Sequence, residues 1–299
     1  MIFRMIKNPV LTGFHADPSL VYVDGVFYIA TSTFEWFPGV RINKSTDLAN
    51  WEPVCYPLDR PSLLHMEGNP KSGGVWAPCL SYSNGLFYLV YTDAKLWVDA
   101  PYKDSPNYIT TAENIEGPWS EPVYINSSGF DPSLFHDDDG RKYFVNMEWD
   151  YRKDDGTQKY QFSGILLTEL DPVTLKAISE PVKIFEGTEK GKVEAPHIYK
   201  KDGFYYLFTA EGGTVYEHAE TLARSWNIEG PYELHPNIYL TCAENFPQFP
   251  IQKTGHGSLA QAADGRWWYA SLCGRPIKGE GDTWRCPLGR ETSINEIIW

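Results

Sequence analysis

The chain has 299 residues, of which 42% are hydrophobic and 22% are charged; this balance excludes a disordered chain, a collagen-like fibre and a disulfide-rich mini-protein. Aspartate and glutamate together number 39 against 26 lysines and arginines, so the formal net charge is −13. Because an acidic surface repels phosphate backbones, we expect no nucleic-acid partner.

The N-terminal residues 1–9 have no extended apolar stretch and no small-residue cleavage site, both of which a secretory signal requires. No stretch approaches the roughly 18 apolar residues of a membrane span, so no membrane partner is expected. The five cysteines form no C-x-x-C pair, which is typical of reduced thiols. We therefore expect a cytoplasmic protein, although a secreted chain with its signal removed would look the same. The sequence leaves a homo-oligomer open.

A short pattern recurs five times, starting near residues 17, 77, 131, 195 and 256. Each copy contains an apolar run, an Asp-Gly or Asn-Gly pair and an aromatic-rich run. The pairs lie at residues 24–25, 84–85, 139–140, 202–203 and 264–265. Such a pair between two apolar runs predicts a β-hairpin, because a type I′ turn needs a positive φ at both central residues.

Each copy continues into segments that resemble turns leading to outer strands, such as residues 45–51, 117–122 and 230–233. A unit of this length, with an inner hairpin and two outer strands, matches one four-stranded propeller blade and its loops. Five such units account for the chain, so we predict an all-β five-bladed β-propeller that forms one domain over residues 1–299. The polar segments 94–108 and 150–162 are expected to be long loops.

Chemistry-bearing residues gather at the repeat starts: Asp17, Trp76, Asp131, Glu194 and His256. Equivalent positions of propeller blades lie at similar distances from one axis, so these side chains are expected to meet at the mouth of the central channel. Three converging carboxylates suit glycoside hydrolysis, in which one acid protonates the leaving oxygen and one carboxylate activates water. Neighbouring negative charges would raise the pKa of one of them, as an acid catalyst at neutral pH requires.

The segments at residues 14–19, 128–133 and 193–197 resemble glycoside hydrolase family 43. The family's fold is a five-bladed propeller, and its reaction inverts the anomeric centre. Taken position by position, the resemblance implies that Asp17 is the general base and Glu194 the general acid. It implies that Asp131 is the third carboxylate, which tunes the pKa of the acid and holds its orientation.

Further segments, at residues 32–40, 74–78, 209–214 and 288–292, resemble the β-xylosidases of this family. This resemblance implies that Phe34 and Trp76 form apolar walls for a sugar ring, that Arg290 hydrogen-bonds sugar hydroxyls and that Thr214 lines the pocket. His256 would lie on the axis below the acids, where family members hold a water or a divalent cation such as calcium. We expect no required cofactor and favour a water-bonded His256 over a metal ligand.

The expected function is that of an inverting, exo-acting β-1,4-xylosidase that releases xylose from xylo-oligosaccharides during xylan degradation. An α-L-arabinofuranosidase, alone or as a second activity, stays open because the two pentoses present similar atoms near the cleaved bond. A catalytically silent sugar-binding propeller is the alternative of another class. Relatives of this type usually continue into a C-terminal β-sandwich domain, which we expect to be absent from this chain. For Glu35 and Glu211, both a role in the site and a structural hydrogen bond stay open.

Overall fold

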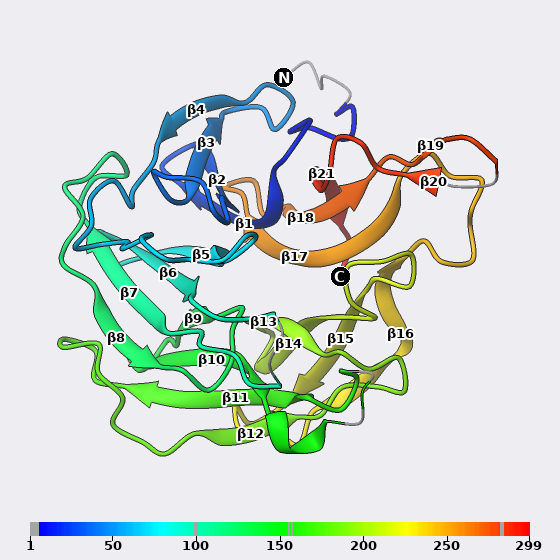
Figure 1. The fold of residues 1–299 in the computed structure, drawn as a ribbon. Coiled ribbons are helices and arrows are strands. Elements are labelled where there is room, and N and C mark those ends of the chain that lie inside the picture. Colours follow the sequence, from blue (N-terminus) through cyan, green and yellow to red (C-terminus); the bar gives the residue numbers. More distant parts are fainter. Residues whose placement is uncertain (1–5, 99–100, 155, 157, 282–283) are drawn as a thin grey trace.

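The computed structural model describes residues 6–98, 101–154, 156, 158–281 and 284–299. Over these residues the strands form five antiparallel blades around a central axis, and the single helical segment is a 3-10 turn, η1 (Tyr151–Lys153) (Figure 1). The predicted all-β five-bladed propeller is therefore confirmed.

The first four blades each contain four strands that pair in chain order. Blades 1 and 2 consist of β1 (Ala16–Val23), β2 (Val26–Ser32), β3 (Arg41–Ser45) and β4 (Glu52–Cys55), and of β5 (Gly74–Ser83), β6 (Leu86–Ala94), β7 (Asn107–Ala112) and β8 (Val123–Asn126). Blades 3 and 4 consist of β9 (Ser133–His136), β10 (Lys142–Trp149), β11 (Phe162–Leu170) and β12 (Val182–Phe185), and of β13 (Glu194–Lys201), β14 (Phe204–Glu211), β15 (Ala219–Ser225) and β16 (Glu233–Cys242).

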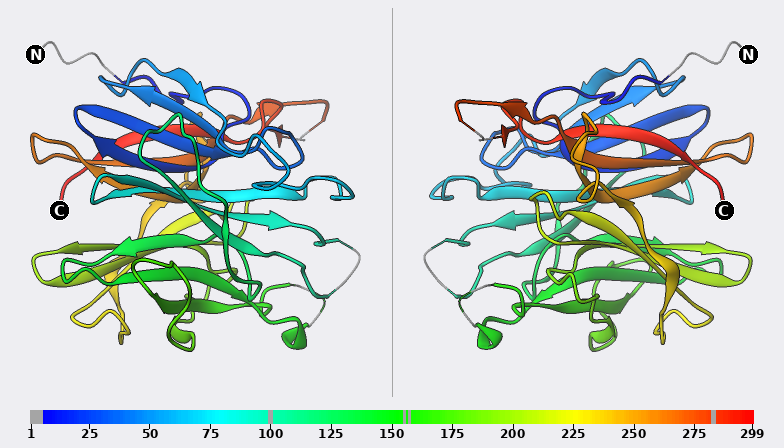
Figure 2. Two further views of the ribbon diagram at one scale, coloured as in Figure 1. Left: turned by 90° about the vertical axis from the view of Figure 1, so that its left-hand side faces the viewer. Right: turned by 90° about the vertical axis from the view of Figure 1, so that its right-hand side faces the viewer.

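The fifth blade departs from the predicted four strands. In the described part of the chain it contains β17 (Gln252–Gln261), β18 (Trp267–Gly274) and β21 (Glu291–Ile297), and a small separate hairpin, β19 (Ile277–Lys278) with β20 (Trp284–Arg285), precedes β21. The N-terminal segment runs beside β21 (Figure 2), where Leu11 forms a β-bridge with Thr292. The Asn8 side chain exchanges two 2.8 Å hydrogen bonds with the backbone of Ile294. The propeller is thus closed by its two ends within one blade.

The Asx-Gly pairs all lie in hairpins between the first and second strands of the blades. At residues 24–25, 84–85 and 202–203 both residues have a positive φ, as a type I′ turn requires. At residues 139–140 and 264–265 only the glycine does, and its N–H bonds back to the carbonyl of Asp137 or Ala262. The prediction of a type I′ turn is wrong at these two hairpins, because their loops are one residue longer.

The apolar core of the described residues is divided among the five interfaces between neighbouring blades. One buried residue from each interface, in order around the ring, is Leu89, Phe144, Leu207, Tyr269 and Trp268. Hydrogen bonds between the inner strands add to this packing around the axis.

Such hydrogen bonds join the first strands of neighbouring blades. The N–H of Leu80 in β5 donates to Ser19 in β1 at 2.8 Å, and the N–H of Leu20 in β1 donates to Ser258 in β17 at 2.7 Å. These bonds fix the spacing of the strands whose first residues surround the axis.

The five cysteines are free thiols, as predicted. Burial raises the pKa of Cys79 to about 11 and that of Cys273 to about 12, so both thiols stay protonated at neutral pH. In the described part of the chain, no helix combines the length and the apolar character that crossing a membrane requires.

Candidate active site

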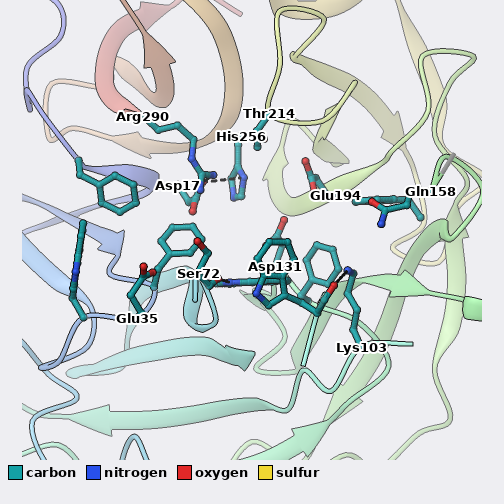
Figure 3. Close-up of a pocket in the computed structure, with 17 residues that line it drawn as sticks. Asp17, Glu35, Ser72, Lys103, Asp131, Gln158, Glu194, Thr214, His256 and Arg290 are labelled. Carbon is teal, nitrogen blue, oxygen red and sulfur yellow. Dashed lines mark hydrogen bonds and ion pairs between the residues drawn. The ribbon is translucent and has the colours of Figure 1, made fainter. Parts of the chain in front are cut away.

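One cavity of about 460 Å³ gathers side chains from all five blades (Figure 3). All eight residues that the sequence singled out line this cavity: Asp17, Phe34, Trp76, Asp131, Glu194, Thr214, His256 and Arg290. Figure 3 shows Asp17 beside Arg290 and His256, Glu194 on the opposite side, and Asp131 below the space between them. Residues far apart in the sequence therefore form one continuous surface.

Irregular backbone turns the repeat starts toward this cavity. Pairing slips within β1 after Ala16 and within β13 after Glu194, and β-bulges of this kind re-aim a side chain. Asp17 has a φ of 55°, Asp131 of 52° and His256 of 49°. Aspartate adopts this left-handed region more readily than most residues, but each such position still costs of order 1–3 kcal/mol. The surrounding blades must hold these conformations in place.

The Asp17 carboxylate is surrounded by groups that favour its charged form. It accepts a 2.9 Å hydrogen bond from Arg290 Nη1 on Oδ1 and a 2.6 Å hydrogen bond from Ser32 Oγ on Oδ2. His256 Nδ1 lies 3.6 Å from the same Oδ1. Burial by itself would raise the pKa of Asp17, but Arg290, His256 and Ser32 outweigh it, so this pKa lies below its usual value. Asp17 is therefore ionised at neutral pH.

The surroundings of Glu194, in contrast, favour its protonated form. Its side chain is buried and its Oε1 has no hydrogen-bond partner. Burial, together with the negative charge of Asp17, raises the pKa of Glu194 to about 8, although Arg290 and two lysines act against the shift. Glu194 therefore carries a proton at neutral pH, with one oxygen free to face a ligand.

Asp131 connects the other two carboxyl groups. Burial, followed by the charges of Glu194 and Asp17, raises its pKa well above the usual value. Its carboxyl accepts a hydrogen bond from the backbone N–H of Ala195, the residue directly after Glu194. Asp131 thus acts on Glu194 both through charge and through the backbone that carries it.

Aromatic rings form the walls of the cavity. Trp76 Nε1 donates a 2.8 Å hydrogen bond to the Ser72 carbonyl, and its ring meets Phe130 edge-to-face with centroids 5.1 Å apart. The guanidinium of Arg290 lies 4.8 Å from the centroid of the Phe34 ring. These contacts hold two apolar surfaces and the Arg290 guanidinium around the carboxyl groups.

Several lining residues were missed by the sequence reasoning: Phe14, Ser72, Lys103, Phe130, Gln158 and Phe162. Glu35 lines the cavity as well, and so do Trp36 and Trp97, which the sequence left open as sugar platforms or core residues. Lys103 and Gln158 come from the two polar loops, where neither a repeat nor an apolar period marks a position. Only the folded loops bring these two residues to the cavity.

Lys103 adds a positive charge on the Glu194 side of the cavity. Its Nζ lies 4.1 Å from the centroid of the Trp149 ring and donates a hydrogen bond to the Trp97 carbonyl at 3.2 Å. Burial lowers the pKa of Lys103 to about 8, although Glu194 acts in the other direction. Trp149 is thus a buried support for Lys103, and it does not line the cavity.

The donor set for a metal ion is small. Among the described residues, no three His, Cys, Asp or Glu side chains gather as a group that could hold a cation. His256 is the candidate ligand from the sequence, and its Nδ1 faces Asp17. A cation at His256 would therefore take most of its ligands from water.

The family model for the glycosyl hydrolases family 43 matches residues 6–299. The chain belongs to this family. Among family 43 relatives it is 56% identical over 294 residues to xylosidase/arabinosidase 43B of Humicola insolens and 54% identical over 299 residues to a beta-xylosidase of Bacillus subtilis. Each alignment covers 98% of this chain, but 53% and 55% of the two relatives. The chain thus spans about half the length of the curated relatives it matches.

A solved structure agrees with this family 43 assignment. The xylan beta-1,4-xylosidase from Bacillus halodurans C-125 superposes with a TM-score of 0.93 at 56% sequence identity. The match covers 99% of this chain and 55% of that structure. The family resemblance inferred from the sequence is therefore confirmed, together with the propeller fold.

Proposed function

We propose that this chain carries an inverting, exo-acting β-1,4-xylosidase activity that releases xylose from xylo-oligosaccharides. The observation that carries the proposal is the opposite protonation of Asp17 and Glu194 in one cavity: the pKa of Asp17 is lowered and that of Glu194 is raised to about 8. A glycosidase of either stereochemical class needs one ionised carboxylate and one protonated carboxyl beside the scissile bond, and the inverting course is inferred from the family. The names of the relatives supply the sugar class.

In the proposed reaction the Asp17 carboxylate accepts a proton from a water molecule. The water oxygen forms a bond to the anomeric carbon while the glycosidic carbon–oxygen bond breaks on the opposite face. Glu194 transfers its proton to the departing oxygen. One water is consumed, and exchange of a proton with solvent restores ionised Asp17 and protonated Glu194.

The remaining residues have proposed roles in binding and charge control. Phe34 and Trp76 would face the apolar surfaces of the sugar ring, and Thr214 would complete the wall. Arg290 would donate to a sugar hydroxyl while its 2.9 Å bond keeps Asp17 ionised. His256 supports the same charged state from 3.6 Å. We propose that the reaction needs only these groups and water.

An α-L-arabinofuranosidase activity, alone or as a second activity, is the other candidate. It is favoured by the name of the Humicola insolens relative, a xylosidase/arabinosidase at 56% identity. Xylopyranose and arabinofuranose present similar atoms near the cleaved bond, so the same three carboxyl groups would serve both reactions.

The test measures sugar release from xylobiose, an aryl β-xyloside and an aryl α-L-arabinofuranoside, with NMR detection of the first anomer formed. We expect xylose from the first two substrates, and α-xylose as the first anomer released from the aryl β-xyloside, whose leaving group is not a sugar. Release of β-xylose first from the aryl β-xyloside would overturn inversion, and faster arabinose release would assign the second candidate. Binding of xylobiose without any hydrolysis would leave a silent sugar-binding propeller. A chelator is expected to leave kcat/KM unchanged; a loss that calcium restores would overturn the metal-free proposal.

The pH dependence of kcat/KM follows from the two pKa shifts. Glu194 must be protonated to donate, so activity is expected to fall as pH rises through about 8. Asp17 must be ionised, and its pKa is lowered, so the acid limb is expected below the usual aspartate value. A pH profile of kcat/KM with xylobiose, whose leaving oxygen needs the proton of Glu194, measures both limbs. An alkaline limb near the ordinary glutamate pKa would contradict the assignment of the acid.

A further inference from the structure

Glu211 is a fully buried carboxylate at the end of β14 that does not line the cavity. Both of its oxygens lie 3.1 Å from the backbone N–H of Thr188. The hydroxyl of Thr188 donates to Oε2 at 2.6 Å, and the hydroxyl of Thr221 donates to Oε1 at 3.0 Å. The backbone N–H of Gly191 is a further donor. The carboxylate therefore accepts hydrogen bonds from three separate places in the chain.

Two of these places belong to the connection that leads into Glu194. Thr188 and Gly191 lie between β12 and β13, and the N–H of Gly191 bonds to the Thr188 carbonyl at 3.0 Å, closing a turn. The N–H of Gly212, directly after Glu211, donates to the Gly191 carbonyl at 2.8 Å. Glu211 and its neighbour thus hold this turn, which ends three residues before Glu194.

The backbone beside Glu194 needs such support. Lys192 has a φ of 57° and Ala195 a φ of 52°, and neither is a glycine. Each left-handed residue of this kind costs of order 1–3 kcal/mol and persists only when its surroundings impose it. Asp131 holds Ala195 on the C-terminal side through a hydrogen bond to its N–H. Glu211 supplies the matching constraint on the N-terminal side.

The donors around Glu211 are neutral N–H and O–H groups. A carboxylate accepts on both oxygens, whereas glutamine has one acceptor oxygen and an NH₂ group that would face the donors. Glu211→Gln therefore keeps the volume of the side chain and removes part of the hydrogen bonding. The substitution therefore tests what the hydrogen bonds to Glu211 do.

We propose that Glu211 is a positioning residue that fixes the turn at residues 188–191, and through it aligns the Glu194 carboxyl with the leaving oxygen. The inference rests on the proposed function for the role of Glu194 as proton donor. The loop that carries Thr214 into the cavity begins directly after Glu211.

The kinetic test compares Glu211→Gln with the unmodified chain on xylobiose and on 2,4-dinitrophenyl β-xyloside. A misaligned donor is expected to lower kcat for xylobiose about 10- to 100-fold, because small displacements of a catalytic group have effects of this size. The dinitrophenolate leaves without a proton, so its kcat is expected to change little, with KM unchanged for both. Thr188→Val removes the 2.6 Å hydrogen bond and should act in the same direction, whereas Thr188→Ser keeps the hydroxyl and should restore activity.

Hydrogen–deuterium exchange supplies a readout that is independent of catalysis. Glu211→Gln is expected to speed amide exchange at residues 188–195 while the inner hairpins keep their protection. An equal loss of kcat on both substrates, or unchanged exchange over these residues, would overturn the positioning role. If the unmodified chain hydrolyses neither substrate, the proposed function fails, and the exchange measurement alone decides whether Glu211 holds the turn.

Discussion

Glu194→Gln is expected to lower kcat for xylobiose by about 10²- to 10⁴-fold, the usual contribution of a general acid. The Glu194 proton is available at neutral pH because burial and the charge of Asp17 raise its pKa to about 8. An amide of the same shape carries no such acidic proton. The departing sugar oxygen would then leave as an unprotonated alkoxide, which is a poor leaving group.

The measurement compares xylobiose with 2,4-dinitrophenyl β-xyloside, whose leaving group needs no proton. We expect the aryl substrate to retain most of its turnover, and the alkaline limb of the xylobiose pH profile to disappear. Glu180→Gln makes the same chemical change at an exposed position fourteen residues earlier, outside the turn at residues 188–191, and serves as the control. Equal losses on both substrates would assign Glu194 to a role other than proton donation.

Asp17→Asn is expected to lower kcat/KM by about 10²- to 10⁴-fold on both substrates alike. Water must be deprotonated whatever the leaving group, so activating the aglycone cannot compensate for a missing base. Asparagine tolerates the left-handed φ of 55° at this position, and its side-chain oxygen can still accept from Ser32. The loss would therefore reflect chemistry and would leave the backbone in place.

The control for this variant is Asp24→Asn. Asp24 also has a left-handed φ, of 48°, but it is exposed in the turn between β1 and β2. The Asp24→Asn substitution should leave kcat/KM and the midpoint temperature of thermal unfolding unchanged. Retention of activity by Asp17→Asn on the aryl substrate alone would show that Asp17 assists the leaving group, and would reverse the two assignments.

The repeat was the strongest predictor of the fold, because each Asx-Gly pair marks a hairpin by local backbone chemistry. The repeat did not predict every local detail of the fold. At residues 139–140 and 264–265 the turn was longer than predicted, and the fifth blade has three strands beside the N-terminal segment within the described residues. Closure by Asn8 and Ile294 joins residues that are 286 positions apart, and no local pattern signals such a pair.

The residues of the candidate site also differ in whether local sequence signals could reveal them. Asp17 and Asp131 occur at equivalent positions of the repeat, and Glu194 lies one residue before the matching position, so their meeting around one axis could be anticipated from spacing. Lys103 and Gln158 could not, because their loops carry no period and only folding brings them to the cavity. Glu211 was left undecided because its partner segment at residues 188–191 is distant in sequence.

The sequence by itself determined the five-bladed propeller, because the signals of the repeat are short and local and recur at regular spacing. It also singled out eight of the residues that line the cavity, five at the repeat starts and three from the family resemblance, which implied the roles of base and acid as well. Only the tertiary structure supplied the physical cause of the different protonation of the carboxyl groups. All three are buried, but Arg290 from the far end of the chain reaches Asp17 at 2.9 Å, whereas Glu194 has an oxygen with no hydrogen-bond partner. Charge and burial at a carboxyl group depend on every segment that surrounds it, and these segments meet only in the folded chain.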